Sequence, residues 1–187
     1  MKKRWSFFIN AVMVMMLLVG CGGNDSSSAE SLTSNQESSF KREDSIPGSY
    51  DVPKGWVKSN KYTTDSKIFY TNKGYENDEH PDNIAISVGN NKYSLEKHVQ
   101  FREAIVQQLL MQSDGIEAQL NGDGTYTKHG DRLYIFTLDE GNVVTTQYYI
   151  LKNYGFCLIH VTNFSGSKSV EEAAKHMVDS FVWKGGY

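Results

Sequence analysis

The sequence predicts an α+β domain in which helices pack on the faces of an antiparallel β-sheet. Three apolar segments near the C-terminal end, 132–138, 143–151 and 156–163, predict the sheet. Short polar segments rich in Gly and Asn separate them, as a meander of hairpins requires. Two other segments, 94–112 and 170–180, have apolar residues at helical spacing and predict the helices that cover the sheet.

Further strands are expected before the first helix, in a globular domain that spans residues 49–187. Residues 50–56 are typical of a short edge strand that leads into a Pro/Gly turn. Residues 67–71 predict another strand. In residues 84–88 apolar side chains alternate with small ones, as in a half-buried strand. Along the chain, the first helix is therefore expected to lie between two groups of strands.

Capping residues support the two helices. Ser94 stands where an N-cap is expected, and the apolar side chains that follow it cover about half of the helix circumference. Ser169 and Glu172 have the spacing of a capping box at the start of the second helix. Both helices are therefore predicted to bury one side against the sheet.

The segment between the first helix and the meander predicts one more hairpin. Ile116, Ala118 and Leu120 alternate with polar residues as in a strand. Residues 121–124, Asn-Gly-Asp-Gly, give a strong turn signal. Residues 181–183 predict a short closing strand or tail.

The N-terminal residues have the pattern of an export signal. Residues 2–4 are basic, residues 7–19 form an apolar run interrupted by Asn10, and small Gly20 stands at the expected cleavage point. The run of 13 residues is shorter than the roughly 17–25 that a transmembrane helix needs. Residues 1–20 are therefore predicted to be a signal peptide.

The residues Leu18-Val19-Gly20-Cys21 resemble the lipobox of bacterial lipoproteins. The resemblance implies cleavage after Gly20 and attachment of a diacylglyceryl group, with further acylation such as palmitate, to Cys21. It implies an extracytoplasmic protein anchored to the cell membrane, with the Ser-rich residues 21–48 as a flexible tether. A plain secretory signal followed by an unmodified cysteine is the alternative.

The composition argues against nucleic acid as a partner. Removal of the leader leaves 16 basic and 22 acidic residues, a formal charge of −6, and no basic stripe stands out. Phosphate binding needs clustered Lys and Arg. Cys157 is the one cysteine left after Cys21, in an apolar strand-like segment, and is predicted to be a small buried hydrophobe.

The sequence predicts no catalytic, cofactor-binding or metal-binding residues. Residues 119–130 have part of the spacing of a calcium loop but lack the ligands at its first and last positions, so a hairpin turn is the prediction. The histidine–carboxylate pairs His129/Asp131 and His80/Asp82 are too small for a zinc site and are predicted to be solvated loop residues.

A Ser-x-x-Lys pair, Ser94 and Lys97, lacks the other elements of penicillin-binding enzymes, and helix capping explains it better. Aromatic residues are frequent in the meander, and they are expected to pack across strands; an exposed aromatic patch that binds a partner is the alternative. The aromatic residues concerned are Tyr126, Tyr134, Phe136, Tyr148, Tyr149, Phe156 and Phe164.

Short motifs at both ends of the domain resemble the PsbP-like family, which includes DcrB-like bacterial lipoproteins. They are Tyr50, Pro53, Gly55 and Trp56 at the start, and Ser180, Phe181 and Trp183 at the end. The resemblance implies an α/β/α sandwich and no shared reaction, because fold does not transfer function.

Three functions are compared on these grounds. The leading hypothesis is a membrane-anchored, non-enzymatic module that binds a protein of the cell envelope or a ligand. The second is an envelope hydrolase whose site is assembled from scattered residues such as His129 and Asp131. The third is a solute-binding protein with a single pocket, so a small ligand is left open.

Overall fold

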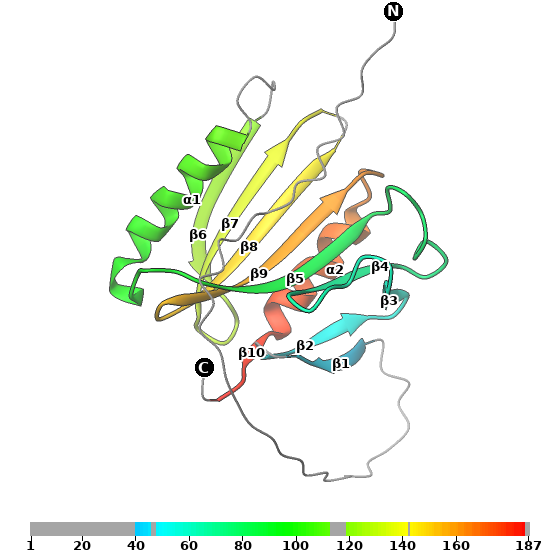
Figure 1. Cartoon of the computed structure of the whole chain (residues 1–187), viewed down its shortest axis with the longest axis horizontal. Coiled ribbons are helices and arrows are strands. Elements are labelled where there is room, and N and C mark those ends of the chain that lie inside the picture. The colour runs from blue at the N-terminus through cyan, green and yellow to red at the C-terminus, as the bar shows by residue number, and fades with distance from the viewer. Residues whose placement is uncertain (1–39, 46–47, 113–118, 142, 186–187) are drawn as a thin grey trace, which may run out of the picture. The chain divides into compact units, whose positions relative to one another are not determined.

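The computed structural model describes residues 40–45, 48–112, 119–141 and 143–185. Figure 1 shows strands joined mostly by short connections, with helices on the two faces of a large sheet. The elements are β1 (Phe40–Asp44), β2 (Gly48–Pro53), β3 (Trp56–Lys58), β4 (Lys67–Asn72), β5 (Asn83–Asn90), η1 (Leu95–Lys97), α1 (His98–Gln112), β6 (Gln119–Tyr126), β7 (Arg132–Asp139), β8 (Val144–Lys152), β9 (Gly155–Asn163), α2 (Lys168–Ser180) and β10 (Val182–Trp183).

Two antiparallel sheets organise the described residues. The larger sheet has the order β3-β4-β5-β9-β8-β7-β6, and the smaller has the order β1-β2-β10. The meander β6 to β9 pairs neighbour with neighbour, and β5 joins it beside β9. The predicted α+β class with an antiparallel sheet is confirmed.

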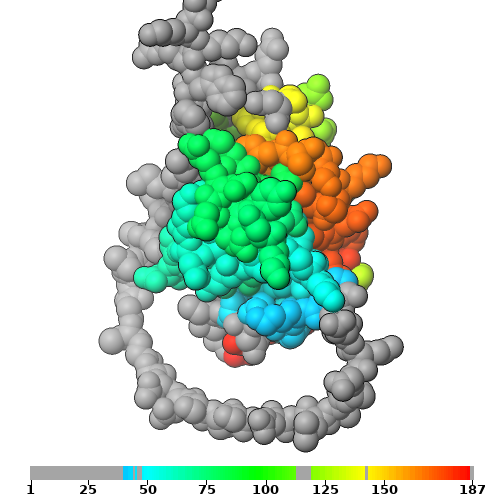
Figure 2. Space-filling model, turned by 90° about the vertical axis from the view of Figure 1, so that its right-hand side faces the viewer, coloured from blue at the N-terminus to red at the C-terminus, as the bar shows by residue number. Residues whose placement is uncertain are grey.

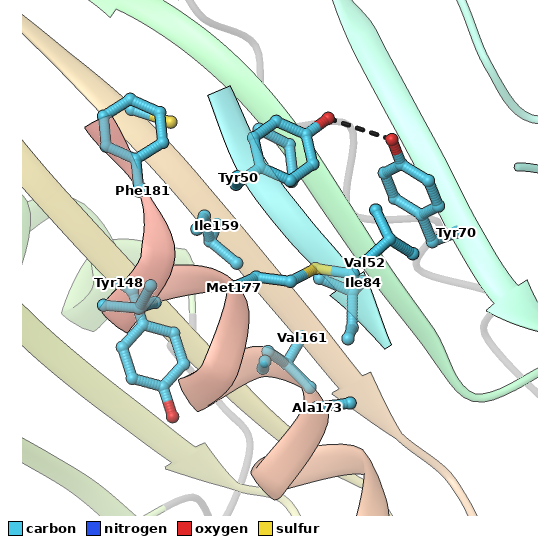
Figure 3. Close-up of a cluster of buried hydrophobic side chains, with 14 of the residues drawn as sticks. Tyr50, Val52, Tyr70, Ile84, Tyr148, Ile159, Val161, Ala173, Met177 and Phe181 are labelled. Atoms are coloured by element: carbon cyan, nitrogen blue, oxygen red, sulfur yellow. Dashed lines mark hydrogen bonds between the residues drawn. The ribbon is translucent and has the colours of Figure 1, made fainter. Parts of the chain in front are cut away.

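One face of the large sheet packs against α2 and the small sheet. Met177, Val170 and Ala174 of α2 are fully buried in one cluster with Ile159 and Val161 of β9. Figure 3 shows Met177 beside Ile159 in this cluster. Buried apolar side chains recur along α2 at positions 170, 173, 174, 177 and 178, so one side of the helix faces the sheet. This cluster is the larger of the two hydrophobic cores.

The opposite face packs against α1. Phe101, Ile105 and Leu109 are buried against aromatic rings of the meander, among them Tyr149 and Phe156. The Phe101 ring lies 5.6 Å from each of these two rings, centroid to centroid. Alternate residues of β8 and β9 thus enter different cores, which confirms the prediction of a central sheet covered on both sides.

The folded part begins earlier than the sequence predicted. Residues 40–44, assigned to the tether, form β1, which pairs with β2 from Phe40 opposite Pro53 to Asp44 opposite Ser49. The polar sequence of β1 hid it, because its side chains form ion pairs and hydrogen bonds at the surface rather than a hydrophobic core. The predicted tether residues 21–39 lie outside the described residues.

The turn predicted at residues 121–124 is wrong. These residues continue β6, which pairs with β7 from Gln119 opposite Asp139 to Tyr126 opposite Arg132. A Cβ on Gly124 would lie 2.8 Å from the Tyr134 ring, and one on Gly122 would lie 3.2 Å from the Phe136 ring. The glycines therefore leave room for aromatic side chains of β7, and the turn follows later, at residues 127–130.

Both helices begin differently from the prediction. Ser94 precedes the short 3-10 helix η1 and forms no side-chain cap, while α1 itself starts at His98. Helix α2 starts at Lys168, and the side chain of Ser167 accepts a hydrogen bond from the backbone N–H of Ser169. Ser167 therefore takes the capping role that the sequence assigned to Ser169.

The two edges of the large sheet differ. At the β3 edge, two loops are tied together: Ser59 Oγ donates to the carbonyl of Glu76 at 2.8 Å, and Tyr62 OH donates to that of Asp78 at 2.6 Å. Figure 2 views the molecule from this side and shows residues of this region as the cyan to green surface. At the other edge, β6 has seven exposed residues among its eight.

Candidate functional site

The predicted lipidation residue Cys21 and the cleavage residue Gly20 lie outside the described residues. The nearest described element is β1, at the start of the folded domain. No helix among the described residues is long and apolar enough to cross a membrane. Of the predicted anchoring arrangement, the structure therefore describes how β1 is attached to the rest of the domain.

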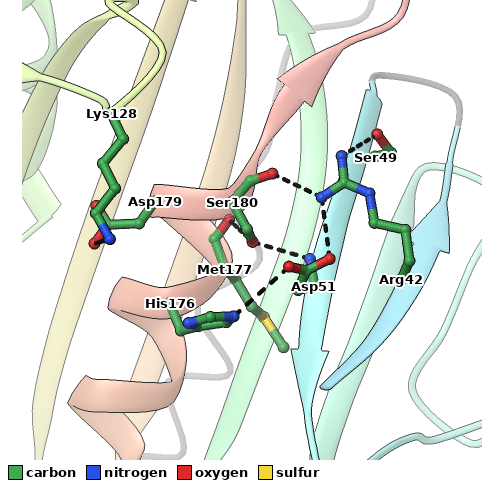
Figure 4. A network of polar contacts seen from close by, with 8 residues as sticks. All are labelled: Arg42, Ser49, Asp51, Lys128, His176, Met177, Asp179 and Ser180. Carbon is green, nitrogen blue, oxygen red and sulfur yellow. Dashed lines mark hydrogen bonds and ion pairs between the residues drawn. The ribbon is translucent and has the colours of Figure 1, made fainter. Parts of the chain in front are cut away.

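Arg42 on β1 ties together three elements (Figure 4). Its guanidinium donates to Asp51 Oδ1 of β2 at 3.0 Å and to the backbone carbonyl of Ser180 at 2.9 Å. It also donates to the hydroxyl of Ser49. The carbonyl of Ser180 is at the C-terminal end of α2, where a cation is favoured by the helix dipole. We call Arg42, Ser49, Asp51, His176 and Ser180 the β1 cluster.

The other side of the β1 cluster is formed by α2. His176 Nε2 lies 3.8 Å from Asp51 Oδ2, and the His176 ring stacks on Phe40 with centroids 3.7 Å apart. Ser180 Oγ accepts from the backbone N–H of Asp51 at 2.9 Å and donates to the carbonyl of Met177 at 3.2 Å. Phe40 and Arg42 of β1, together with Asp51 of β2, thus fix the two strands to α2.

The β1 cluster contains a serine, a histidine and an aspartate, but its geometry is structural. Ser180 Oγ is committed to backbone groups, and the Asp51 carboxylate accepts from Arg42, which neutralises it. A nucleophilic serine needs a histidine that accepts its proton. The cluster therefore holds β1 in place and does not form a catalytic triad. Sequence reasoning missed it because Arg42 stands in a polar segment without periodicity.

The first histidine–carboxylate pair belongs to the turn between β6 and β7. Asp131 bonds with Thr127 through its side chain and its backbone N–H, at 3.4 and 3.1 Å. Burial raises the pKa of Asp131, and the bond to Thr127 opposes that shift. His129 is exposed at the turn. Asp131 stabilises the turn, so the prediction of a solvated loop residue is confirmed for exposed His129 and corrected for half-buried Asp131.

The second pair connects two loops. Asp82 Oδ1 accepts from the backbone N–H groups of Phe164 and Ser165 at 2.7 and 3.0 Å, and Oδ2 accepts from the Ser165 hydroxyl at 2.6 Å. His80 lies beside Phe164, with ring centroids 5.7 Å apart. These residues orient the segment that leads into α2, rather than being merely solvated as predicted.

Ser94 and Lys97 also belong to a helix start, because the backbone N–H of Lys97 donates to the carbonyl of Ser94 at 2.9 Å. Within the described ranges, no three His, Cys, Asp or Glu side chains lie close enough together to hold a metal ion.

Most aromatic residues of the meander are core residues. Tyr134, Phe136, Tyr148, Tyr149 and Phe156 are all at most 8% exposed. The exposed ones, Tyr126 at 62% and Phe164 at 42%, are far apart along the fold, next to β7 and α2 respectively. Cross-strand packing is therefore the main role of these side chains.

β9 carries two titratable side chains, one fully buried and one half-buried. Cys157 is fully buried, as predicted, and burial raises the pKa of its thiol. Burial and then the charge of Lys67 lower the pKa of His160 to about 4, and its Nδ1 is shielded from solvent without a hydrogen-bond partner. The His160 ring is therefore neutral at pH 7.

Two open hollows flank α1. One, of about 550 Å³, includes the charged residues Lys92, Lys97 and Glu103 in its wall. The other, of about 330 Å³, lies between α1 and β6 and includes Val106, Leu120 and Phe136 in its wall. Small-ligand sites are usually enclosed, whereas both hollows are open to solvent, so neither has the form of one.

The likeness to known proteins is one of fold. No protein-family model and no curated protein matches this sequence. The solution structure of cyanobacterial PsbP (CyanoP) from Synechocystis sp. PCC 6803 is similar over 83% of this chain and 98% of that chain, with a TM-score of 0.57 and 11% identity. A crystal structure from Bacteroides thetaiotaomicron VPI-5482 covers 80% of this chain and 50% of that chain at 15% identity, but its TM-score of 0.44 carries no argument. The described domain therefore has the PsbP-like fold that the sequence predicted.

Proposed function

We propose that this protein is an extracytoplasmic lipoprotein that holds a non-enzymatic binding module at the bacterial cell membrane. The single observation that carries the proposal is the N-terminal pattern: basic residues 2–4, the apolar run 7–19, and Leu-Val-Gly-Cys ending at Cys21. A basic start, a short apolar run and a small residue at the cleavage point are the three parts of an export signal.

The physical properties of the mature chain support lipid as the anchor. Its formal charge of −6 disfavours adsorption to anionic lipid, so an attachment that does not depend on charge is needed. One acyl chain binds a membrane only marginally, whereas two give stable anchoring. A diacylglyceryl group on Cys21 supplies two chains at one residue.

The early start of the folded domain shortens the proposed tether. Eighteen residues separate Cys21 from Phe40, where β1 begins. A flexible segment of that length has a root-mean-square reach of about 20–25 Å. The β1 cluster fixes the strand that follows, so the tether would end at a firm attachment point, and the domain would stay within a short distance of the headgroups.

A non-enzymatic role is supported by the contacts of the polar side chains. The carboxylates of Asp51, Asp82 and Asp131 each bond to neighbouring protein groups that fix strands, loops or turns. The hydrolase alternative relied on His129 and Asp131, and this pair belongs to a turn in which Asp131 bonds back to Thr127. A binding role uses surfaces rather than these groups.

Replacement of Cys21 by alanine tests the anchor. The Cys21→Ala variant should lose labelling by a palmitate analogue in growing bacteria and should leave the membrane fraction, or accumulate with its leader uncleaved. Cys157→Ala is the matched control, because that thiol is fully buried and should keep both properties. Unchanged lipid labelling of Cys21→Ala would refute the lipoprotein assignment.

The binding role has its own experiment. Crosslinking in intact cells, followed by purification of the wild type and of Cys21→Ala, should recover the same envelope protein with less yield from the unanchored variant. Recovery of no specific protein or ligand from the anchored wild type would contradict the binding module, even where the anchor itself is confirmed.

A further inference from the structure

β6 is a long edge strand that lacks the usual protection against pairing with another chain. Natural edge strands are commonly short, charged or interrupted by proline. The other edge of this sheet, β3, has three residues and ends at Lys58, and the outer strand of the small sheet carries Lys41 and Arg42. β6 has eight residues, Gln-Leu-Asn-Gly-Asp-Gly-Thr-Tyr, without lysine, arginine or proline.

Two glycines make this edge accessible. Gly122 and Gly124 are exposed, and the rings of Phe136 and Tyr134 from β7 lie against them. On this face the two glycines cover buried aromatic rings, Tyr134 at 1% and Phe136 at 2% exposure, and carry no side chains that protrude from the strand. Alternate N–H and C=O groups of an edge strand point away from the sheet, where a further strand can bond to them.

Helix α1 offers an apolar flank beside the same edge. Val99 and Val106 are seven residues apart, about two helical turns, so they lie on one side of α1. Val99 is 43% exposed, and Val106 lines the hollow of about 330 Å³ between α1 and β6. The sequence predicted that the apolar side of this helix, to which both belong, would be buried against the sheet. Val106 is half-buried and packs against the core cluster that contains Phe101 and Phe136, whereas Val99 stays exposed.

We propose that β6 pairs in antiparallel orientation with β6 of a second copy of this chain, which joins two sheets across a two-fold axis. Charge favours this occupant. Lys128 and Arg132 lie at the C-terminal end of β6, and Asp139 and Glu140 lie at its other end, beside Gln119. Antiparallel pairing brings the basic end of each copy to the acidic end of the other.

Other charges at these ends reduce the complementarity, and Arg132 is the cation that carries it. Asp131 bonds within its own turn, and Lys128 forms an ion pair with Asp179 at 3.1 Å in the same chain. Arg132 stacks between Tyr126 and Tyr134, with its guanidinium carbon 5.0 Å from each ring, so it remains at the edge.

The two-fold axis also restricts the register. In a symmetric antiparallel pair, one residue must lie opposite itself. Asp123 at that position would place two carboxylates together, which is unfavourable. Gly122 at that position lets the backbones approach closely and puts Asn121 of each copy opposite Asp123 of the other. We therefore infer a register centred on Gly122.

Crosslinking of the full chain in bacterial membranes tests this pairing. A cysteine at Asp123 lies close to the two-fold axis, so Asp123→Cys treated with a short bismaleimide should give a covalent dimer. Lys58→Cys, at the opposite edge of the sheet, is the matched control, and the chain without an added cysteine shows any dimer formed through Cys21. Addition of Asn121→Lys to Asp123→Cys should reduce the dimer at least tenfold, because it places a charge on the edge.

Each outcome decides the proposal. A dimer at position 123 that is absent at position 58 and is lost with Asn121→Lys supports it, and the same result in a Cys21→Ala background shows that it does not depend on the anchor. Equal dimers at both positions would indicate random collision and overturn it. Adducts of 123 with a different protein, or no adduct in a variant that remains protease-resistant, would overturn pairing between copies as well.

Discussion

Removal of the Arg42 side chain should loosen β1 from the domain, and the structure allows the size of the effect to be worked out. Arg42→Ala deletes an ion pair with Asp51, a bond to the Ser180 carbonyl and a bond to Ser49. The side chain is 46% exposed, so water replaces part of each interaction. The largest loss is expected at the C-terminal end of α2, where the Arg42 guanidinium contacts the Ser180 carbonyl.

The separate contributions can be added with a discount for exposure. An exposed ion pair contributes about 0.2–1 kcal/mol, and a cation at a helix C-terminus about 0.3–1 kcal/mol. A net hydrogen bond of this kind contributes about 0.5–1.5 kcal/mol, less when it is exposed. We expect Arg42→Ala to lower the free energy of unfolding by about 1–2 kcal/mol. Arg42→Lys should lie between, because an ammonium cannot reach all three acceptors at once.

The assay is equilibrium unfolding in urea at pH 7 of the chain without residues 1–21, combined with hydrogen exchange. Amide protection should fall in β1, while β8 in the centre of the sheet keeps its protection. Lys41→Ala is the matched control. Its side chain is 79% exposed and pairs only with Glu43 of the same strand, so the change in free energy should stay below about 0.5 kcal/mol.

Equal stability of Arg42→Ala and Lys41→Ala would refute the reasoning. A fall in stability without faster exchange in β1 would refute it as well, because the loss would then not be located at the β1 cluster. The result also bears on the proposed tether, since a loosened β1 would lengthen the flexible segment between Cys21 and the core.

Three further predictions concern buried groups. Tyr50→Phe should lower the free energy of unfolding by about 1–3 kcal/mol, because it leaves the buried Tyr70 hydroxyl without its hydrogen-bond partner at 2.9 Å. A double-mutant cycle with Tyr70→Phe should show coupling between the two side chains, and additive effects would contradict the pair. Between pH 6.5 and 4 the unfolded chain binds a proton at His160 that the folded chain does not. The free energy of unfolding should therefore decrease by at most about 3 kcal/mol as the pH is lowered through that window. In His160→Gln the urea midpoint of unfolding should change less with pH over the same window. An unchanged pH dependence of the midpoint would show that this side chain is not responsible. Cys157 should react with a thiol reagent only after unfolding, because its side chain is fully buried. In native lipidated protein from membranes no thiol should therefore react. One reactive thiol per chain would indicate an unmodified Cys21.

Elements with a clear periodic pattern were predicted correctly. Buried residues on both faces of β8 and β9 indicated a sheet between two layers, and Tyr148 and Tyr149 do enter opposite cores. Apolar spacing in α2 predicted the side that contacts the sheet, with Met177 at its centre. In these elements burial repeats with the period of the backbone, so the local sequence carries the information.

Other elements depend on contacts between distant residues. β1 is polar, and what fixes it is a carbonyl at Ser180, 138 residues further along the chain. Nothing in the residues around Arg42 indicates that acceptor. The α1 pattern misled for a related reason: apolar residues cover half its surface, but the sheet contacts only the side with Phe101, Ile105 and Leu109. A sequence shows which residues are apolar, and the packing decides which of them are buried.

The turn predicted at Asn121–Gly124 shows how one such contact bears on function. Glycine in a strand is unfavourable unless another group fills the space of its missing side chain. Here the rings of Tyr134 and Phe136 fill that space, so the β6–β7 pair gains aromatic packing. The same glycines leave two positions of the outer edge of β6 without side chains, and the strand has no lysine, arginine or proline that would keep another strand away. The feature that stabilises the hairpin therefore also exposes its edge, and this is why a binding surface is expected at β6 rather than at the protected β3 edge.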